Sequence, residues 1–178
     1  MTLPGASLSR RRSSGNASIR HICGRSNGPR WSKTSGRELL LVRKDLVAVR
    51  LEKLRNYLKT LKAIRKFDLE TFKKDVFVHA TAERYLHLSI ECLLDIGSHI
   101  ISDRGYRKPD TYGEIFEILA EEGVISTTLL KELEGMAAFR NILVHDYFRL
   151  DPDQVYGILR DRIKTLEKLA KVYAALLE

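Results

Sequence analysis

The chain has little of what marks a secreted, metal-binding or membrane protein. It contains two cysteines, Cys23 and Cys92, in 178 residues, which are too few for a disulfide framework and lack the spacing of metal ligands. Four prolines and eleven glycines exclude a low-complexity chain. No apolar run approaches the roughly 20 residues of a membrane span or has the form of a secretory signal. We therefore expect a folded protein of the reducing cytosol.

Acidic residues are absent from the first 37 positions. This segment is rich in Ser and Gly and holds eight of the 31 Lys and Arg residues. Residues 38–178 contain 23 basic and 23 acidic residues, so the net charge of +8 arises from residues 1–37 alone. We expect this segment to be a disordered basic extension, because it has too few aliphatic side chains to offset the entropy of ordering.

Three roles for residues 1–37 stay open. Their composition matches a transit peptide, a basic arm that binds RNA, or an extension without function that is translated from an upstream start codon. The remainder, 38–178, is expected to be one domain. Since that domain has no excess of positive charge, any affinity for RNA must come from a local patch.

The domain is expected to be all-α, because apolar residues recur at three- and four-residue steps and no convincing strand or repeat is present. The pattern predicts a bundle of about five helices. Asp68, Ser126 and Asp151 are suited to cap helix N-termini. The main helices are expected over residues 38–64, 76–102, 112–122, 127–148 and 152–178, with a short additional helix after Asp68.

The residues with chemical potential are concentrated in one stretch of the helix expected over 127–148. It reads Arg140-Asn141-Ile142-Leu143-Val144-His145-Asp146-Tyr147. An arginine is always charged and a histidine titrates near neutrality, so the two could hold a phosphate and move a proton. At about 100° per residue, Arg140 and His145 project about 140° apart, whereas Tyr147 lies about 20° from Arg140. They bracket one face of the helix without being aimed at one atom.

Spacing alone also fits a purely structural role. An arginine and a histidine on a bundle helix often satisfy carbonyl groups or pair with acids, and a tyrosine often lies at a bundle edge. Glu91, Asp95 and His99 share one face of the long helix at i, i+4 and i+8. This set could be a polar seam facing the motif helix, a metal site or a solvated stripe, and the solvated stripe is favoured. Cys92 is expected to be a buried small hydrophobe.

The motif resembles the Arg-x4-His-x-Tyr signature of HepT-type ribonuclease toxins of the HEPN superfamily. Residues 84–96 look like the long second helix of these proteins, 112–116 like the third and 44–64 like the first. The similarity covers residues 40–178 and none of the basic extension. The complete string RNxLVHxY in this order of helices is far more specific than the Arg-x4-His spacing alone.

This resemblance implies a HEPN-type bundle and a metal-independent endoribonuclease without a cofactor. Arg140 and His145 match the family's catalytic pair, and Asn141 matches a supporting polar neighbour that would orient His145 or a phosphate. Tyr147 matches the tyrosine that receives AMP from the antitoxin. The resemblance further implies a type VII-like toxin–antitoxin module. Its partners would be RNA (with tRNA as one candidate), a second copy of the chain in a homodimer and an MntA-like nucleotidyltransferase antitoxin.

An alternative comes from a different functional class. HEPN-like bundles also serve as noncatalytic nucleotide-binding or adaptor subunits of minimal nucleotidyltransferases, and a plain helical adaptor is a third option. The intact Arg140 and His145 favour the enzyme. Cleavage of RNA in the absence of divalent metal, compared with the variant His145→Ala, discriminates between these classes.

Overall fold

A computed structural model describes residues 36–145 and 150–177, with side chains from Lys44 onward. All of them belong to the compact unit Thr34–Glu178. In the described part of the chain every regular element is an α-helix, so the all-α prediction is confirmed. The helices are α1 (Gly36–Ile64), α2 (Leu69–Lys74), α3 (Val76–Arg104), α4 (Tyr112–Glu121), α5 (Thr127–Leu133), α6 (Met136–His145), α7 (Pro152–Asp161) and α8 (Ile163–Ala175).

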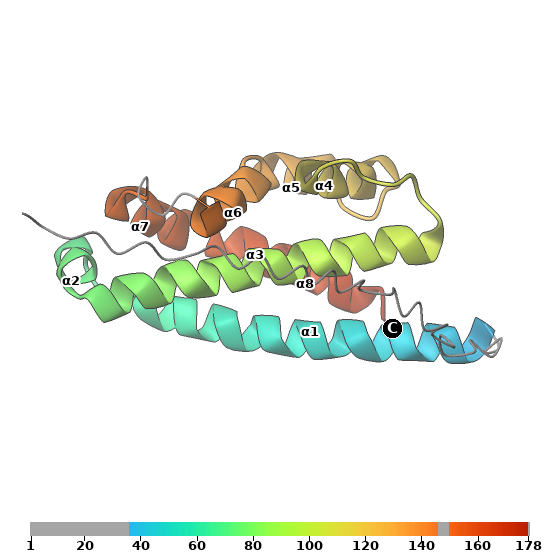
Figure 1. Ribbon diagram of the computed structural model, residues 1–178, viewed down its shortest axis with the longest axis horizontal. Coiled ribbons are helices and arrows are strands. Elements are labelled where there is room, and N and C mark those ends of the chain that lie inside the picture. Colours follow the sequence, from blue (N-terminus) through green and yellow to red (C-terminus); the bar gives the residue numbers. More distant parts are fainter. Residues whose placement is uncertain (1–35, 146–149, 178) are drawn as a thin grey trace, which may run out of the picture. The chain divides into compact units, whose positions relative to one another are not determined.

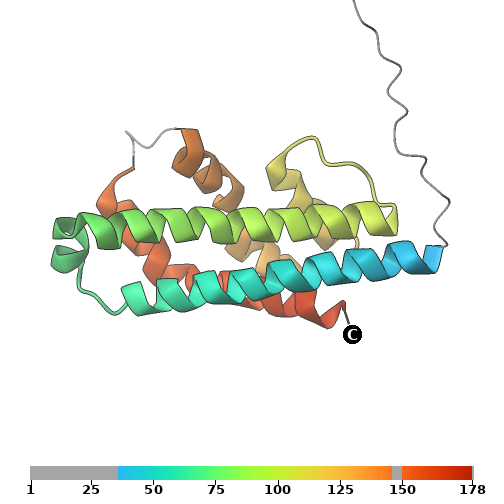
Figure 2. The ribbon, with the colours of Figure 1, turned by 60° about the horizontal axis from the view of Figure 1, so that its bottom comes forward.

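Helix α3 is the centre of this unit and contacts α1, α2, α4, α6, α7 and α8. Helices α1 and α3 run antiparallel over most of their lengths, and α3 lies between α1 and the shorter helices α4 and α6 (Figures 1 and 2). Since α6 packs on both α3 and α4, residues on these three helices can meet at one place.

The predicted N-caps are confirmed. Side-chain oxygens of Asp68, Ser126 and Asp151 accept hydrogen bonds from backbone N–H groups of α2, α5 and α7 at 2.8, 3.1 and 3.0 Å. Such caps satisfy donors that a helix leaves unpaired at its first turn. These three helix starts are therefore determined by local sequence.

The expectation of one continuous helix over 127–148 is wrong. The helix α5 ends at Leu133, and Gly135 adopts a φ of 77°, a left-handed conformation that ends a helix and favours glycine. The chain turns there, and α6 begins at Met136. This turn is what lets the motif helix lie across α3 and α4.

The expected C-terminal helix is also divided. An interruption at Arg162 separates α7 from α8, and the guanidinium of Arg162 donates a hydrogen bond of 2.6 Å to the carbonyl oxygen of Glu132 near the end of α5. This contact across the bundle satisfies a carbonyl that the end of α5 leaves free. It ties α5 to the α7–α8 junction.

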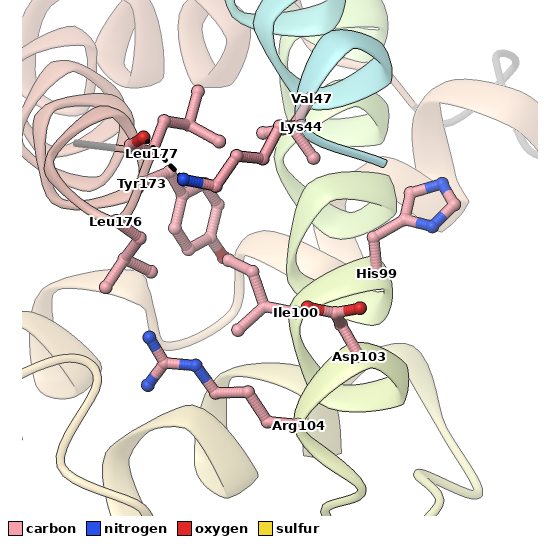
Figure 3. A pocket seen from close by; sticks show the side chains of 9 residues that line it. All are labelled: Lys44, Val47, His99, Ile100, Asp103, Arg104, Tyr173, Leu176 and Leu177. Carbon is pink, nitrogen blue, oxygen red and sulfur yellow. Dashed lines mark hydrogen bonds between the residues drawn. The ribbon is translucent and has the colours of Figure 1, made fainter. Parts of the chain in front are cut away.

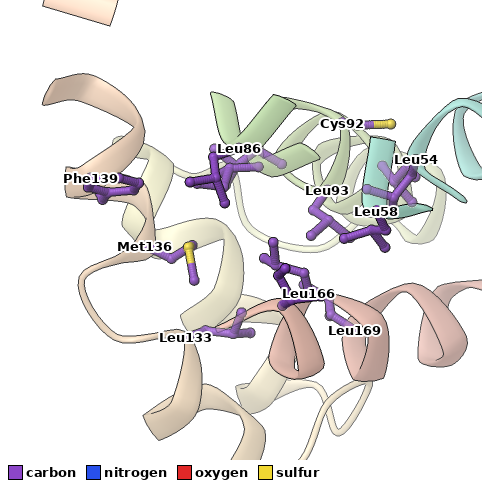
Figure 4. Close-up of a cluster of buried hydrophobic side chains, with 14 of the residues drawn as sticks. Leu54, Leu58, Leu86, Cys92, Leu93, Leu133, Met136, Phe139, Leu166 and Leu169 are labelled. Atoms are coloured by element: carbon purple, nitrogen blue, oxygen red, sulfur yellow. The ribbon is translucent and has the colours of Figure 1, made fainter. Parts of the chain in front are cut away.

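The apolar core joins the helices that carry the motif to the long helices (Figure 4). Leucines of α1, α3 and α8 meet residues of α5 and α6, and burial of each such side chain contributes about 1.5–3 kcal/mol. The labelled members are Leu54, Leu58, Leu86, Cys92, Leu93, Leu133, Met136, Phe139, Leu166 and Leu169. Cys92 is buried as expected, and burial raises the pKa of its thiol to about 11.

A separate cavity of about 170 Å³ lies where α1, α3 and α8 approach one another (Figure 3). There the ammonium group of Lys44 donates a hydrogen bond of 3.0 Å to the carbonyl oxygen of Leu177. This contact links the N-terminal part of α1 to the end of α8.

None of the described helices combines the length and apolar character that crossing a membrane requires.

Candidate active site

The motif helix α6 is held to the core by its apolar side. Met136 and Phe139 are 4% and 5% exposed, and Leu143 packs against the same core. The backbone N–H of Phe139 donates to the carbonyl oxygen of Gly135 at 2.9 Å, which begins the helix directly after the turn. Phe139 and Leu143 thus anchor the helix to the core, whereas Ile142, which the sequence pattern places on the same side, is not part of it. Polar side chains on its other side are therefore presented from a fixed support.

Arg140 is held from three directions. Its Nε donates a hydrogen bond of 2.5 Å to the Glu91 carboxylate of α3, and its Nη1 donates to Oδ1 of Asn141 at 3.2 Å. Its Cζ lies 4.8 Å from the ring centroid of Tyr112, the first residue of α4, within the range of a cation–π contact. With its side chain 12% exposed, Arg140 is largely immobilised while it still borders solvent.

Electrostatics keep this guanidinium charged at every accessible pH. The hydrogen bond from Arg140 to Glu91 is the largest cause that raises the pKa of Arg140, and burial opposes it. Two N–H donors are engaged by Glu91 and Asn141, and the Nη atoms retain further donors. The arrangement can therefore bind one anionic oxygen or more without losing its internal support.

A second arginine and a histidine lie on α3, about two turns and one turn before Glu91. Nη1 of Arg84 lies 3.1 Å from Nδ1 of His87. Burial is the largest cause that lowers the pKa of His87, followed by the charge of Arg84, with Arg140 a smaller contributor and Glu91 opposing. Burial and the charge of Arg84 thus favour an uncharged imidazole at His87.

His145 is the last described residue of α6 and is exposed. It makes no hydrogen bond or ion pair with another residue of the ranges 36–145 and 150–177, so the structure does not join it to Arg140. The Asn141 side chain contacts Arg140 and not His145. Tyr147, the expected modification site, lies outside the described residues. Of the sequence-derived site residues, Arg140 and Asn141 are therefore in contact, and His145 projects from the end of the same helix.

The favoured interpretation of Glu91, Asp95 and His99 as a solvated stripe is wrong for Glu91. Glu91 binds Arg140, and Asp95 accepts from Nε of Arg50 on α1 at 3.4 Å. The first alternative, a polar seam facing the motif helix, describes Glu91. In the described ranges no group of three or more His, Cys, Asp or Glu side chains is placed to hold a metal ion.

Glu91 and Tyr112 are the site residues that sequence reasoning did not assign. Glu91 could have been found from its position, because it lies on the polar side of a long helix that is otherwise apolar. That position indicated that Glu91 does not face the core. Tyr112 gave no signal, because an aromatic residue in the first turn of a helix is common. Only the crossing of α3, α4 and α6 brings both to Arg140.

An all-α bundle with an arginine and a histidine on a short, core-anchored helix is what a HEPN-type protein is expected to have. The family model described as ribonuclease HepT-like matches residues 52–173, and the chain belongs to this family. The resemblance seen in the sequence is thereby confirmed.

Similar proteins agree with this assignment. The YutE protein of Bacillus subtilis is 30% identical over 63% of this chain and 78% of its own length. The tRNA nuclease HepT of Aphanizomenon flos-aquae is 31% identical over 62% of this chain and 76% of its own. A solved structure of a tri-AMPylated HEPN toxin from Shewanella oneidensis, in complex with an MNT antitoxin, superposes with a TM-score of 0.67 at 25% identity. That alignment covers 74% of this chain and 98% of the other.

Proposed function

We propose that this protein is a toxin endoribonuclease that cleaves RNA without a metal ion, through Arg140 and His145. The observation that carries the proposal is the fixed guanidinium of Arg140, which is held by Glu91, Asn141 and Tyr112 and still has donors to offer. Membership of a ribonuclease family supports the reaction class. Curated relatives act on different targets, one as a tRNA nuclease and one as an mRNA nuclease, so the proposal extends to RNA and not to a particular RNA.

The chemistry needs only groups that the motif supplies. A base removes the proton of the ribose 2′-hydroxyl, the resulting oxygen attacks the adjacent phosphorus, and the 5′-oxygen leaves with a proton. His145 exchanges these protons, a role suited to an imidazole. Arg140 donates hydrogen bonds to the non-bridging oxygens, whose charge grows in the transition state. The products are a 2′,3′-cyclic phosphate and a 5′-hydroxyl, and Asn141 supports Arg140.

A second copy of the chain would complete the cleft. Arg140 and His145 project apart on one helix, so a homodimer that brings two motifs together would supply opposing groups. A hollow of about 320 Å³ between α1 and α3 lies beside Glu91, and its rim includes Leu46 and Val49, which are 41% and 51% exposed. Exposed apolar side chains next to the site support this dimer.

The proposal includes control by a nucleotidyltransferase of the MntA type. Such a partner would transfer AMP from ATP to the hydroxyl of Tyr147, with pyrophosphate leaving. The Shewanella toxin structure contains AMPylated toxin together with its MNT antitoxin, which supports this mode of control. A phosphate two residues from His145 would occupy the place of the RNA phosphate and repel RNA.

The test is RNA cleavage by the purified chain in EDTA. The unsubstituted protein should cleave, and His145→Ala and Arg140→Ala should each lower the rate by about 100-fold or more. Lys171→Ala, an exposed change on α8, is the matched control and should cleave normally. End-group analysis should find a 2′,3′-cyclic phosphate. Cleavage that requires added magnesium, or that survives in both motif variants, would contradict the proposed mechanism.

A further inference from the structure

A second hollow, of about 530 Å³, lies where the segment after α1 meets α7. The buried Tyr156 of α7 forms its base. The hydroxyl of Tyr156 donates a hydrogen bond of 2.8 Å to the carbonyl oxygen of Phe67. The ring centroids of Tyr156 and Phe72 lie 5.3 Å apart. These contacts fix the shape of the hollow. Its lining consists of Arg65, Lys66, Phe67, Asp68, Leu69, Tyr156 and Arg160, and we call it the basic hollow.

Three cations line the basic hollow. Arg65, Lys66 and Arg160 form no ion pair with any other residue that the structure describes. The one carboxylate of the lining, Asp68, is engaged elsewhere. It accepts hydrogen bonds from the backbone N–H of Thr71 at 2.8 Å and from the Thr71 hydroxyl at 3.0 Å. With three cations and one carboxylate, the lining keeps a net positive charge.

Two neighbouring acids are already paired with lysines that do not line the hollow. Glu70 of α2 pairs with Lys74 at 3.6 Å, and Asp153 of α7 pairs with Lys73 at 2.7 Å. Both carboxylates are thus matched by lysines outside the hollow. The domain has no overall positive charge, so a local excess of this kind is where a polyanion would be attracted.

An aromatic ring accompanies the charge. Phe67 is 43% exposed at the rim, and Cζ of Arg160 lies 5.8 Å from the ring centroid of Tyr156. Cations that follow a phosphate backbone, next to a ring on which a base can stack, are the elements of single-stranded nucleic-acid sites. Binding of a small anion such as sulfate would require only the cations. The exposed ring of Phe67 at the rim favours a ligand that also carries a base.

The position of the hollow suits the same RNA strand as the motif. Helix α6 ends next to α7, and α7 lies next to α2 (Figures 1 and 2). The ten residues of α7 span about 15 Å. A strand that passes His145 and follows α7 would reach Arg160 within a few nucleotides.

We propose that the basic hollow is a second RNA-backbone site, in which Arg65, Lys66 and Arg160 hold phosphates away from the scissile one and Phe67 stacks on a base. This inference rests on the proposed ribonuclease function. It adds a contact that selects longer single strands over the smallest substrates.

The first experiment measures binding of a labelled single-stranded RNA of about 20 nucleotides to the full chain at several salt concentrations. The triple variant Arg65→Gln, Lys66→Gln, Arg160→Gln should lower the slope of log Kd against log salt by about 2, as expected for three lost phosphate contacts. The control triple Arg55→Gln, Lys131→Gln, Lys171→Gln removes the same charge from other exposed positions and should change the slope little. The basic segment 1–37 is present in both variants, so its contribution to the salt dependence of binding is the same in each.

The second experiment compares cleavage of that RNA with cleavage of a dinucleotide. The hollow variant should lose about 10-fold or more in kcat/KM on the long RNA and keep its rate on the dinucleotide, which reaches only the motif. Phe67→Ala should weaken long-RNA binding by about 5- to 100-fold, and Phe67→Tyr should restore it because the ring is kept.

The outcomes separate the two proposals. An unsubstituted protein that cleaves no RNA would overturn the ribonuclease function and the role of the hollow with it. An active protein whose hollow variant matches the control triple on long RNA would overturn the hollow alone. Unchanged RNA binding, together with lost binding of an antitoxin protein, would also overturn it and would assign the hollow to a protein partner.

Discussion

At the scale of single residues, Arg140 shows that a functional side chain is defined by the groups that hold it. A flexible surface arginine would lose conformational entropy on binding phosphate. Here the carboxylate of Glu91 and the ring of Tyr112 have already fixed the guanidinium. The same carboxylate competes with phosphate for the charge of Arg140. Glu91 is therefore a positioning residue whose effect is on geometry.

Glu91→Ala should lower kcat by about 10- to 100-fold with little change in KM, because a displaced guanidinium stabilises the transition state poorly. Glu91→Gln keeps an oxygen that accepts from Nε of Arg140, so it should recover most of the loss. Steady-state cleavage of a short RNA measures both values. If the two substitutions were equally damaging, charge and not orientation would be the property that matters.

His87 should make stability depend on pH. Burial and the charge of Arg84 lower the pKa of His87 from its ordinary 6.5. The unfolded chain therefore binds this proton more readily than the folded chain. Stability should be unaffected well above pH 6.5 and should fall as the pH drops through 6.5 toward the lower folded-state pKa. Thermal unfolding of His87→Gln should show a weaker loss over this range than the unsubstituted protein.

Arg84→Gln is the matched comparison for this effect. It removes the charge of Arg84 and keeps the burial of His87, so the pKa of His87 should be lowered less. The loss of stability on acidification should therefore lie between those of the unsubstituted protein and His87→Gln. Identical pH profiles for all three proteins would show that His87 does not contribute.

At the scale of elements, the site depends on how closely α3 approaches α4 and α8. Gly97, in the C-terminal third of α3, makes this approach possible. A Cβ at Gly97 would lie 2.7 Å from Cγ2 of Ile115 on α4 and 2.9 Å from the hydroxyl of Tyr173 on α8. That hydroxyl is buried without a hydrogen-bond partner in the described part of the chain, and burial raises the pKa of Tyr173. The close packing of α3, α4 and α8 thus leaves the Tyr173 hydroxyl without a hydrogen bond in the described part of the chain.

Gly97→Ala should destabilise the fold by about 1–3 kcal/mol, because the added methyl group enters occupied space. Gly157→Ala on α7 is the control. A Cβ added at Gly157 would have no atom from outside its own helix within 4 Å. Because alanine has the higher helix propensity, this substitution should leave the stability unchanged or raise it. Denaturant unfolding of both variants measures the difference. Equal stabilities would show that the helices can separate without cost.

Tyr173→Phe tests the same contact from the other side. Removing an unpartnered hydroxyl should leave stability unchanged or raise it. In the Gly97→Ala background it should recover part of the loss, because one of the two closest atoms is gone. A double variant no more stable than Gly97→Ala would assign the clash to Ile115 alone.

At the scale of the whole molecule, a ribonuclease toxin must be controlled by something outside its own fold. Tyr147 follows the exposed His145 by two residues in the sequence, and we propose it as the residue through which a partner protein exerts this control. A modification there would act on the cleft directly and would need no change in the bundle.

Tyr147→Phe should keep ribonuclease activity, since the phenol has no chemical role in our mechanism, and should escape inactivation by a cognate nucleotidyltransferase with ATP. Mass spectrometry should find AMP on the peptide that contains Tyr147 in the unsubstituted protein. Tyr106→Phe is the control and should be inactivated normally. AMP only on another tyrosine, or full activity after modification of Tyr147, would contradict this switch.

The sequence by itself determined the local features of the protein. Apolar periodicity predicted which regions are helical, although two of the predicted helices are each divided. Asp68, Ser126 and Asp151 predicted three helix starts, because a cap acts on the next turn of its own chain. The string from Arg140 to Tyr147 was sufficient to indicate the family, since its residues are neighbours on one helix.

Only the tertiary structure decided which residues surround that string. Glu91 and Tyr112 are 49 and 28 positions from Arg140 in the sequence. They reach it because α3, α4 and α6 cross after the turn at Gly135, whose backbone conformation ended a helix that periodicity alone would have continued. The basic hollow likewise joins residues 65–69 to α7. Periodicity describes one helix at a time, whereas the charge, burial and support of a site depend on contacts between helices that no local pattern encodes.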